Sequence, residues 1–281
     1  MSRRGGRTGA RAGTPPRVLS GIVKVILTVM YLVPLLWIVI EAFKSDDQSL
    51  AAPDALIFTP TLATFRTVIA AAAGSVVLSL VIAAIATVAV TVVGVPAAYA
   101  LTQRTSPRWG RVIAVVLTML LILQMVPQPM TVIPLYGVLA RWHLLGSVGG
   151  LVIADTALVL PFSILLLRPF AMAIPKSLYE AAALDGASNA QIFLRIVIPL
   201  LRNGIATVAS IVWGEFIYAT NFLTEGSQLP VSALLAEQIS IYSANWNRLM
   251  ALALLTSLPL LAVFLFAQRR LTAGLTLGAV R

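Results

Sequence analysis

The pattern of hydrophobic and polar positions is dominated by six long apolar segments, separated by short polar ones. Each segment is close to or longer than the roughly 20 apolar residues that an α-helix needs to cross a bilayer. Strands of a membrane barrel would be about ten residues long with alternating polarity, which these segments do not show. The sequence therefore predicts an all-α integral membrane protein with six transmembrane helices. The predicted spans are Val18–Phe43, Ser75–Leu101, Val112–Met130, Val148–Leu167, Gly204–Leu223 and Asn247–Ala267.

Prolines interrupt some of these spans, and polar stretches separate them. Proline removes a backbone donor and clashes with the preceding turn, so it kinks or ends a helix. Such interruptions fall at Pro127, Pro129 and Pro134 in the third span and at Pro259 in the sixth. Residues 44–74 are predicted to form an external loop that is irregular over residues 51–66. Leu135–Leu145 is predicted to be a short helix at the membrane surface.

Composition supports lipid as the surrounding solvent. The chain is 59% hydrophobic and 11% charged, whereas ordinary soluble domains are about 25% charged. The absence of cysteine excludes a disulfide scaffold, a thiolate metal site and a cysteine nucleophile. His143 is the single histidine, which argues against a histidine metal cluster or a Ser–His triad, and we expect it at the surface. We predict no cofactor, no metal and no enzymatic activity of the chain itself.

The positions of lysine and arginine predict the orientation, since cytoplasmic loops carry an excess of both. Of the 20 such residues, only Lys44, Arg66, Arg141 and Arg248 fall on one side of the predicted spans. The others fall on the opposite side, so both termini are predicted to be cytoplasmic. The net charge of +10 thus reflects topology rather than nucleic-acid binding. Residues 1–17 are predicted to be a disordered basic tail before a retained first span, because Glu41–Lys44 is no small-residue cleavage site.

The polar loop between the fourth and fifth spans, residues 168–203, has the signals of two short helices and a sharp turn. Pro175 suits a helix start, and Gly186 suits the left-handed residue that ends a helix. Ser188 and Gln191 have the spacing of a capping box for a second helix that runs to Pro199. Spacing alone leaves open whether this hairpin lies on the membrane surface or docks its small alanine face into another protein.

This loop resembles the EAA loop of ABC importer permeases. The matching residues are Glu180-Ala181-Ala182, Asp185-Gly186-Ala187, Phe193, Ile196, Ile198 and Pro199, with Ile198 in place of the usual leucine. The tail Gly274–Arg281 and the element Trp213-Gly214-Glu215-Phe216 are similar to those of carbohydrate permeases of the maltose-importer type, specifically the second permease. Gly214 stands where that family has asparagine. The resemblance covers roughly residues 75–281, divided into a permease core, 75–267, and a cytoplasmic tail, 268–281.

The resemblance implies a type I importer fold in the plasma membrane of a bacterium and a sugar-like solute. It also implies an ATPase dimer, a second permease subunit and an external solute-binding protein as partners. The chain contains no G-x-x-x-x-G-K-[ST] phosphate loop, so ATP would be hydrolysed by the separate ATPase. The residues expected to couple to that ATPase are Glu180, Ala181, Ala182, Asp185 and Gly186.

Polar residues inside the spans are the candidates for the solute path, because ionisable groups in lipid are costly. The candidates are Gln124, Asp155, Glu215, Tyr218 and Asn221. Alternatively, these side chains tie helices together within the bundle. Import of a polyol, a glycerol phosphate or a peptide remains open. An ion-coupled secondary transporter is a weaker alternative, since it predicts paired intramembrane charges and two repeats, and the sequence shows no obvious repeat.

Overall fold

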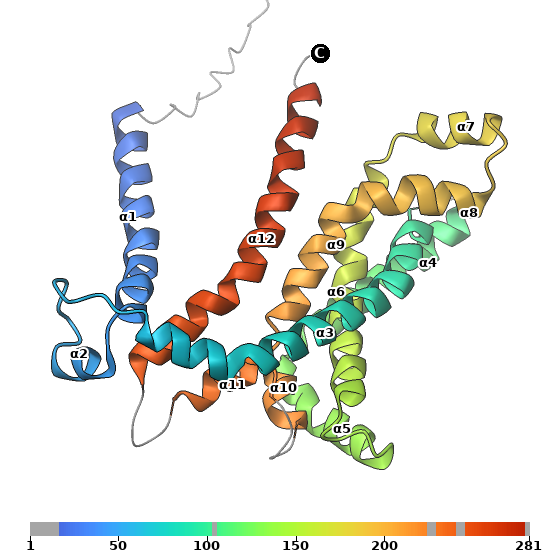
Figure 1. Ribbon diagram of the computed structural model, residues 1–281. Coiled ribbons are helices and arrows are strands. Elements are labelled where there is room, and N and C mark those ends of the chain that lie inside the picture. The colour runs from blue at the N-terminus through green and yellow to red at the C-terminus, as the bar shows by residue number, and fades with distance from the viewer. Residues whose placement is uncertain (1–16, 103–105, 224–228, 240–244, 279–281) are drawn as a thin grey trace, which may run out of the picture.

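The computed structural model describes residues 17–102, 106–223, 229–239 and 245–278, and the regular elements over these residues are helices (Figure 1). In chain order they are α1 Arg17–Ala42, α2 Asp46–Ala51, α3 Ala63–Ala100, α4 Pro107–Gln124, α5 Gln128–Arg141, α6 Val148–Met172, α7 Lys176–Leu184, α8 Asn189–Ile192, a π-helical turn Phe193–Val197, α9 Ile198–Trp213, α10 Ile217–Phe222, α11 Val231–Glu237 and α12 Trp246–Gly278. The basic segment 1–16 and the last residues of the predicted tail, 279–281, lie outside the described residues.

Six helices in the described part of the chain are long and apolar enough to cross a membrane, which confirms the predicted number of spans. They are α1, α3, α4, α6, the continuous helix Asn189–Trp213, and α12. The short helices α2, α5, α7, α10 and α11 connect them. The predicted surface helix Leu135–Leu145 corresponds to the longer α5, which begins at Gln128.

The second span begins at Ala63, twelve residues before the predicted Ser75. The prediction that residues 51–66 are irregular is therefore wrong in part. Residues 46–51 form α2, and α3 runs for 38 residues from Ala63. At 1.5 Å per residue this helix is about 57 Å long, well beyond the roughly 30 Å of the hydrocarbon core. It runs obliquely across the other long helices (Figure 1). Its first turns contain polar residues such as Thr64 and Arg66, so a prediction based on the length of apolar runs did not include these turns.

The third and fifth spans also end earlier than predicted. α4 stops at Gln124, because Pro127 caps α5 and Pro129 occupies the first turn of that new helix. The fifth span ends at Trp213 rather than at Leu223, and α10 is a separate short helix.

The fifth span also starts earlier, because Pro199 does not interrupt the helix. The N–H of Ile198 bonds to the carbonyl of Phe193, five residues earlier, in a π-helical turn. Pro199, which has no N–H, directly follows this turn in the first turn of α9. A π-helical turn thus takes the place of the predicted break between a surface helix and a span.

The core forms where α3 packs against α6 and α9. Ala86, Val90 and Ala98 of α3 are fully buried, and a Cβ on Gly94 would lie 3.2 Å from the hydroxyl of Ser163 in α6. By contrast, α1 is exposed over most of its length and is buried only at its C-terminal end, where it meets α12 (Figure 1). The apolar side chains of α1 are therefore left for lipid or for another protein to cover.

Gly204 provides a test of the packing between α6 and α9. A Cβ at this position would lie 2.6 Å from Cδ2 of Leu167, so a larger side chain forces α6 and α9 apart. We expect Gly204→Val to destabilise the protein by roughly 1–3 kcal/mol, the usual cost of overpacking. The loss is measurable as a lower melting temperature by intrinsic fluorescence in detergent.

Gly137→Val in α5 is the matched control, since nothing lies within 4 Å of a Cβ built there. We expect this control to melt close to the wild-type temperature. Equal melting temperatures for the two variants would contradict the packing described here.

Candidate functional site

The loop between the fourth and fifth spans folds as a compact helical hairpin. α7 follows Pro175 and ends at Leu184, and Gly186, two residues later, has the φ of +77° of the left-handed conformation predicted from the sequence. The N–H groups of Gly186 and Ala187 bond to the carbonyls of Ala183 and Ala182, at 3.1 and 2.9 Å. Both arms of the predicted capping box are present, since Gln191 N–H donates to Ser188 Oγ and Ser188 N–H donates to Gln191 Oε1. The hairpin is thus held by its own backbone and caps.

The outer surface of the hairpin is unpartnered within the chain. Leu184 is 89% exposed. Of the five residues predicted to couple to an ATPase, Ala182 is half-buried and the others are exposed. The hairpin lies at the same end of the molecule as the start of α1 and the end of α12 (Figure 1). It therefore presents a small, partly apolar surface on the side where α1 begins and α12 ends (Figure 1).

The inner surface of the hairpin is anchored to the end of α3 by aromatic rings. The ring of Tyr99 lies 5.9 Å from that of Tyr179 in α7 and 6.2 Å from that of Phe193 in the π-helical turn. Burial, together with the neighbouring Tyr99, raises the pKa of the Tyr179 hydroxyl. Ile174 and Ile192 are also buried here. The hairpin is therefore in direct contact with the end of α3.

The two predicted intramembrane acids meet near the other end of the bundle. Glu215 lies in the break between α9 and α10, and its carboxylate accepts hydrogen bonds from Gln128 Nε2 at 2.7 Å, Tyr218 N at 2.9 Å and Ala219 N at 3.2 Å. Asp155 of α6 is 1% exposed and lines the same small pocket as Glu215. The carboxylate of Glu215 thus caps α10 and links it to α5, which explains why the predicted fifth span breaks at this point.

The other predicted path residues are divided between the interior and the surface. Tyr218 is buried, its hydroxyl bonds to that of Thr131, and its ring stacks on Phe222. Asn221 is exposed, and Gln124 is exposed at the end of α4. The structure therefore brings together Asp155, Glu215 and Tyr218 but neither Gln124 nor Asn221. Sequence reasoning missed Gln128 and Thr131, which lie 87 residues from their partners and carry no local signal.

An open apolar cavity of about 680 Å³ lies between α9, α11 and α12. Trp213 and Leu260 line it, and Ser232 and Thr256 provide hydroxyl groups. The Trp213 indole Nε1 donates to the carbonyl of Thr256 at 3.2 Å, which fixes the ring between the two long helices. The cavity has the size and the mainly apolar lining with few polar groups that are typical of small-molecule sites.

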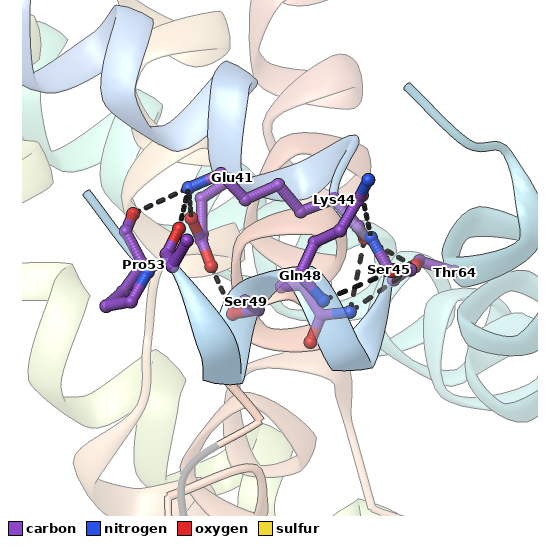
Figure 2. Close-up of polar contacts among 9 residues, drawn as sticks. Glu41, Lys44, Ser45, Gln48, Ser49, Pro53 and Thr64 are labelled. Atoms are coloured by element: carbon purple, nitrogen blue, oxygen red, sulfur yellow. Dashed lines mark hydrogen bonds and ion pairs between the residues drawn. The ribbon is translucent and has the colours of Figure 1, made fainter. Parts of the chain in front are cut away.

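A buried polar cluster, which sequence reasoning did not predict, joins the ends of three helices at the opposite end from the hairpin (Figure 2). Lys44 is completely buried, pairs with Glu41 at 2.9 Å, and donates to the carbonyl of Pro53 at 2.6 Å. Ser49 of α2 donates to Glu41. The rings of Trp37 and Phe58 lie 5.6 and 5.9 Å from the Lys44 ammonium. The only sequence signal was an acid and a base three residues apart at the end of the first span.

The same cluster reaches α3 and α12 through the main chain of Lys44. Its carbonyl accepts from Thr64 Oγ1 at 3.0 Å and from Asn247 Nδ2 at 3.3 Å. Asn247 and Arg248 both donate to Asp46, and they hold the pKa of that carboxyl below its ordinary value. We call this cluster, formed by Glu41, Lys44, Asp46, Thr64 and Asn247, the clamp. It fixes the end of α1 and the starts of α3 and α12 relative to one another.

Breaking the buried ion pair tests the clamp. Lys44→Met leaves the Glu41 carboxylate buried without its counter-charge, which typically costs about 3–5 kcal/mol. We expect a lower melting temperature in detergent and more rapid proteolysis of the 44–62 connection. The double variant Glu41→Gln/Lys44→Met, which leaves no unpaired charge, should recover part of the stability. Wild-type stability of the single Lys44→Met variant would contradict the role of the clamp.

Comparison with known proteins places this geometry in context. A family model described as binding-protein-dependent transport system inner membrane component matches residues 91–276. The chain is 30% identical to the diacetylchitobiose uptake system permease protein DasC of Streptomyces coelicolor, over 94% of this chain and 97% of that protein. It is 36% identical to the osmoprotective compounds uptake permease protein GgtD of Synechocystis, over 72% of this chain and 68% of that protein.

The fold is similar to that of a chain in the crystal structure of a bacterial ABC transporter involved in the import of the acidic polysaccharide alginate. The TM-score is 0.70 at 19% identity, over 92% of this chain and 99% of that chain. At this identity the likeness concerns the fold, which agrees with the six-helix arrangement predicted from the sequence.

Proposed function

This chain belongs to the family of binding-protein-dependent transport system inner membrane components, and we propose that it is a permease subunit of an ATP-driven sugar importer. It spans the plasma membrane of a bacterium with both termini in the cytoplasm. The solute crosses from outside to inside, and the energy comes from ATP hydrolysed by a separate ATPase dimer. A second permease subunit and an external solute-binding protein complete the transporter.

The α7–α8 hairpin is the observation that carries this proposal. Its self-capped fold leaves its outer surface exposed at the end of the molecule where α1 begins and α12 ends, as a docking element requires. The excess of Lys and Arg on this side supports a cytoplasmic location, where an ATPase would meet it. Glu180, Ala181, Ala182, Asp185 and Gly186 form the proposed coupling surface. Closure of the ATPase moves the hairpin, and Tyr99 transmits the movement to α3.

Two unpartnered surfaces support a second permease subunit. The exposed apolar length of α1 and the open cavity beside Trp213 both lack a cover within the chain. A second six-helix subunit packed against them would enclose a path between the two chains. Of the predicted path residues, Gln124, Glu215 and Asn221 are at least partly accessible, and we propose them as contacts for solute hydroxyls. Asp155 and Tyr218 are buried and act behind that surface.

The proposed solute is a sugar or sugar-like compound. The resemblance of the tail and of the Trp213–Phe216 element to carbohydrate permeases supports this class, as does the likeness to a permease for diacetylchitobiose uptake. The likeness to a permease for osmoprotective compounds keeps small polyols as the alternative solute. Hydroxyl groups on the cavity wall, from Ser232 and Thr256, suit either class.

Substitutions in the hairpin test the function and its coupling together. In a strain that lacks the gene, the wild-type chain should restore uptake of the radiolabelled sugar that binds the cognate external protein. Gly186→Val strains the left-handed turn, and Glu180→Lys reverses a charge on the coupling surface. We expect both variants to reach the membrane in normal amounts. Their uptake rate should fall at least about tenfold, which corresponds to roughly 1.4 kcal/mol.

Leu50→Lys, on the exposed surface of α2 at the opposite end, is the control for a new charge and should leave the ATPase association intact. Co-purification of the ATPase separates the possible outcomes. Normal uptake and normal ATPase association in both hairpin variants would refute the coupling assignment. Uptake that never depends on an ATPase would refute the proposed function as a whole.

A further inference from the structure

Both oxygens of the Glu215 carboxyl accept hydrogen bonds from neutral donors. Oε1 accepts from Gln128 Nε2 and Tyr218 N, and Oε2 accepts from Ala219 N. Tyr218 and Ala219 are the second and third residues of α10, so two of these donors are backbone N–H groups of its first turn. Glu215 is thus the hydrogen-bond acceptor that joins α10 to α5.

Asp155 is in the opposite situation. It is 1% exposed, and its Oδ1 atom has no hydrogen-bond partner among the described residues. Asp155 lines a small, partly open pocket of about 10 Å³, and Glu215, Ser79 and Ser232 line the same pocket. An ionised Asp155 would thus be a buried charge without donors beside a second negative charge.

No cation in the described part of the chain offsets this pair. The ion pairs among the described residues are Glu41–Lys44, within the clamp, and Asp46–Arg248, which joins the clamp to α12. The other titratable group beside the two acids is Tyr218 of α10, a neutral phenol. α5 contributes the neutral Gln128, and α3 and α11 contribute only the hydroxyls of Ser79 and Ser232. No group of three or more His, Cys, Asp or Glu side chains that could hold a metal ion occurs among the described residues.

We propose that the two carboxyl groups bind one proton between them, held on Asp155 and donated in a hydrogen bond to the carboxylate of Glu215. Two adjacent carboxyls in a low-dielectric site cannot both ionise without a large penalty, and sharing one proton removes it. The proton converts Asp155 from an unsatisfied acceptor into a donor. The site thereby gains a hydrogen bond and loses a buried charge.

With the proton bound, a hydrogen bond from neutral Asp155 to the Glu215 carboxylate connects three elements. Asp155 brings in α6, Glu215 brings in the break after α9, and Gln128 brings in α5. Loss of the proton would set two like charges against each other at the point where α10 begins. The helix break that divides the fifth span from α10 is thus stabilised by protonation of a residue in another span.

Infrared spectroscopy of the full chain in lipid nanodiscs tests this assignment directly. At neutral pH we expect one carbonyl stretching band of a protonated carboxylic acid, with the small shift in D₂O that identifies an exchangeable acid proton. Asp155→Asn should abolish this band. Asp54→Asn, which changes an exposed acid of the 44–62 connection, should leave the band in place.

The stability of the same variants supplies a second measurement. The amide that Asp155→Asn introduces would donate to Glu215 as the protonated acid does, so this variant should keep the wild-type melting temperature, while Asp155→Ala should lower it by several degrees. Absence of the acid band in wild type, its persistence in Asp155→Asn, or an equal loss of stability in Asp155→Asn and Asp155→Ala would each overturn the proposal. None of these measurements depends on transport, so they do not depend on the proposed function.

Discussion

Lipid cannot hydrogen-bond to a polar group, so a polar atom inside this bundle is stabilised only by a partner within the protein. Specific contacts meet this constraint at several helix ends. The first turn of α10 is bound by a carboxylate, the proline of α9 follows a π-helical turn, and the buried lysine that follows α1 donates to the carbonyl of Pro53. The helix ends are therefore fixed by specific side chains rather than by apolar length, and the functional surfaces are built at those ends.

α3 connects the three polar centres of the molecule. Its Thr64 belongs to the clamp, its Ser79 accepts from Val231 N at 2.8 Å beside the carboxyl pair, and its Tyr99 contacts the hairpin. Small buried residues along its length allow α6 and α9 to approach closely. Under the proposed function, α3 is the element that would link movement of the hairpin to the carboxyl pair and the clamp.

Local features of the structure could be predicted because a local signal in the sequence specifies them. Six spans follow from apolar length, the turn at Gly186 follows from its freedom to adopt positive φ, and the capping box follows from the spacing of Ser188 and Gln191. The early start of α3 was missed because its first turns are polar and are satisfied by the distant Lys44 carbonyl. The end of α9 was missed because Glu215 acts through Gln128, which is far away in sequence.

The central claim is that the α7–α8 hairpin is the cytoplasmic docking surface for the ATPase. Because the chain has no native cysteine, one cysteine in place of the exposed Leu184 can be labelled selectively with a membrane-impermeant maleimide. We expect labelling in inside-out vesicles but not in intact cells, and protection when the ATPase is bound, whereas Asp54→Cys should show the opposite sidedness and no protection. Labelling of the Leu184→Cys variant from outside the cell, or equal labelling with and without the ATPase, would contradict the account.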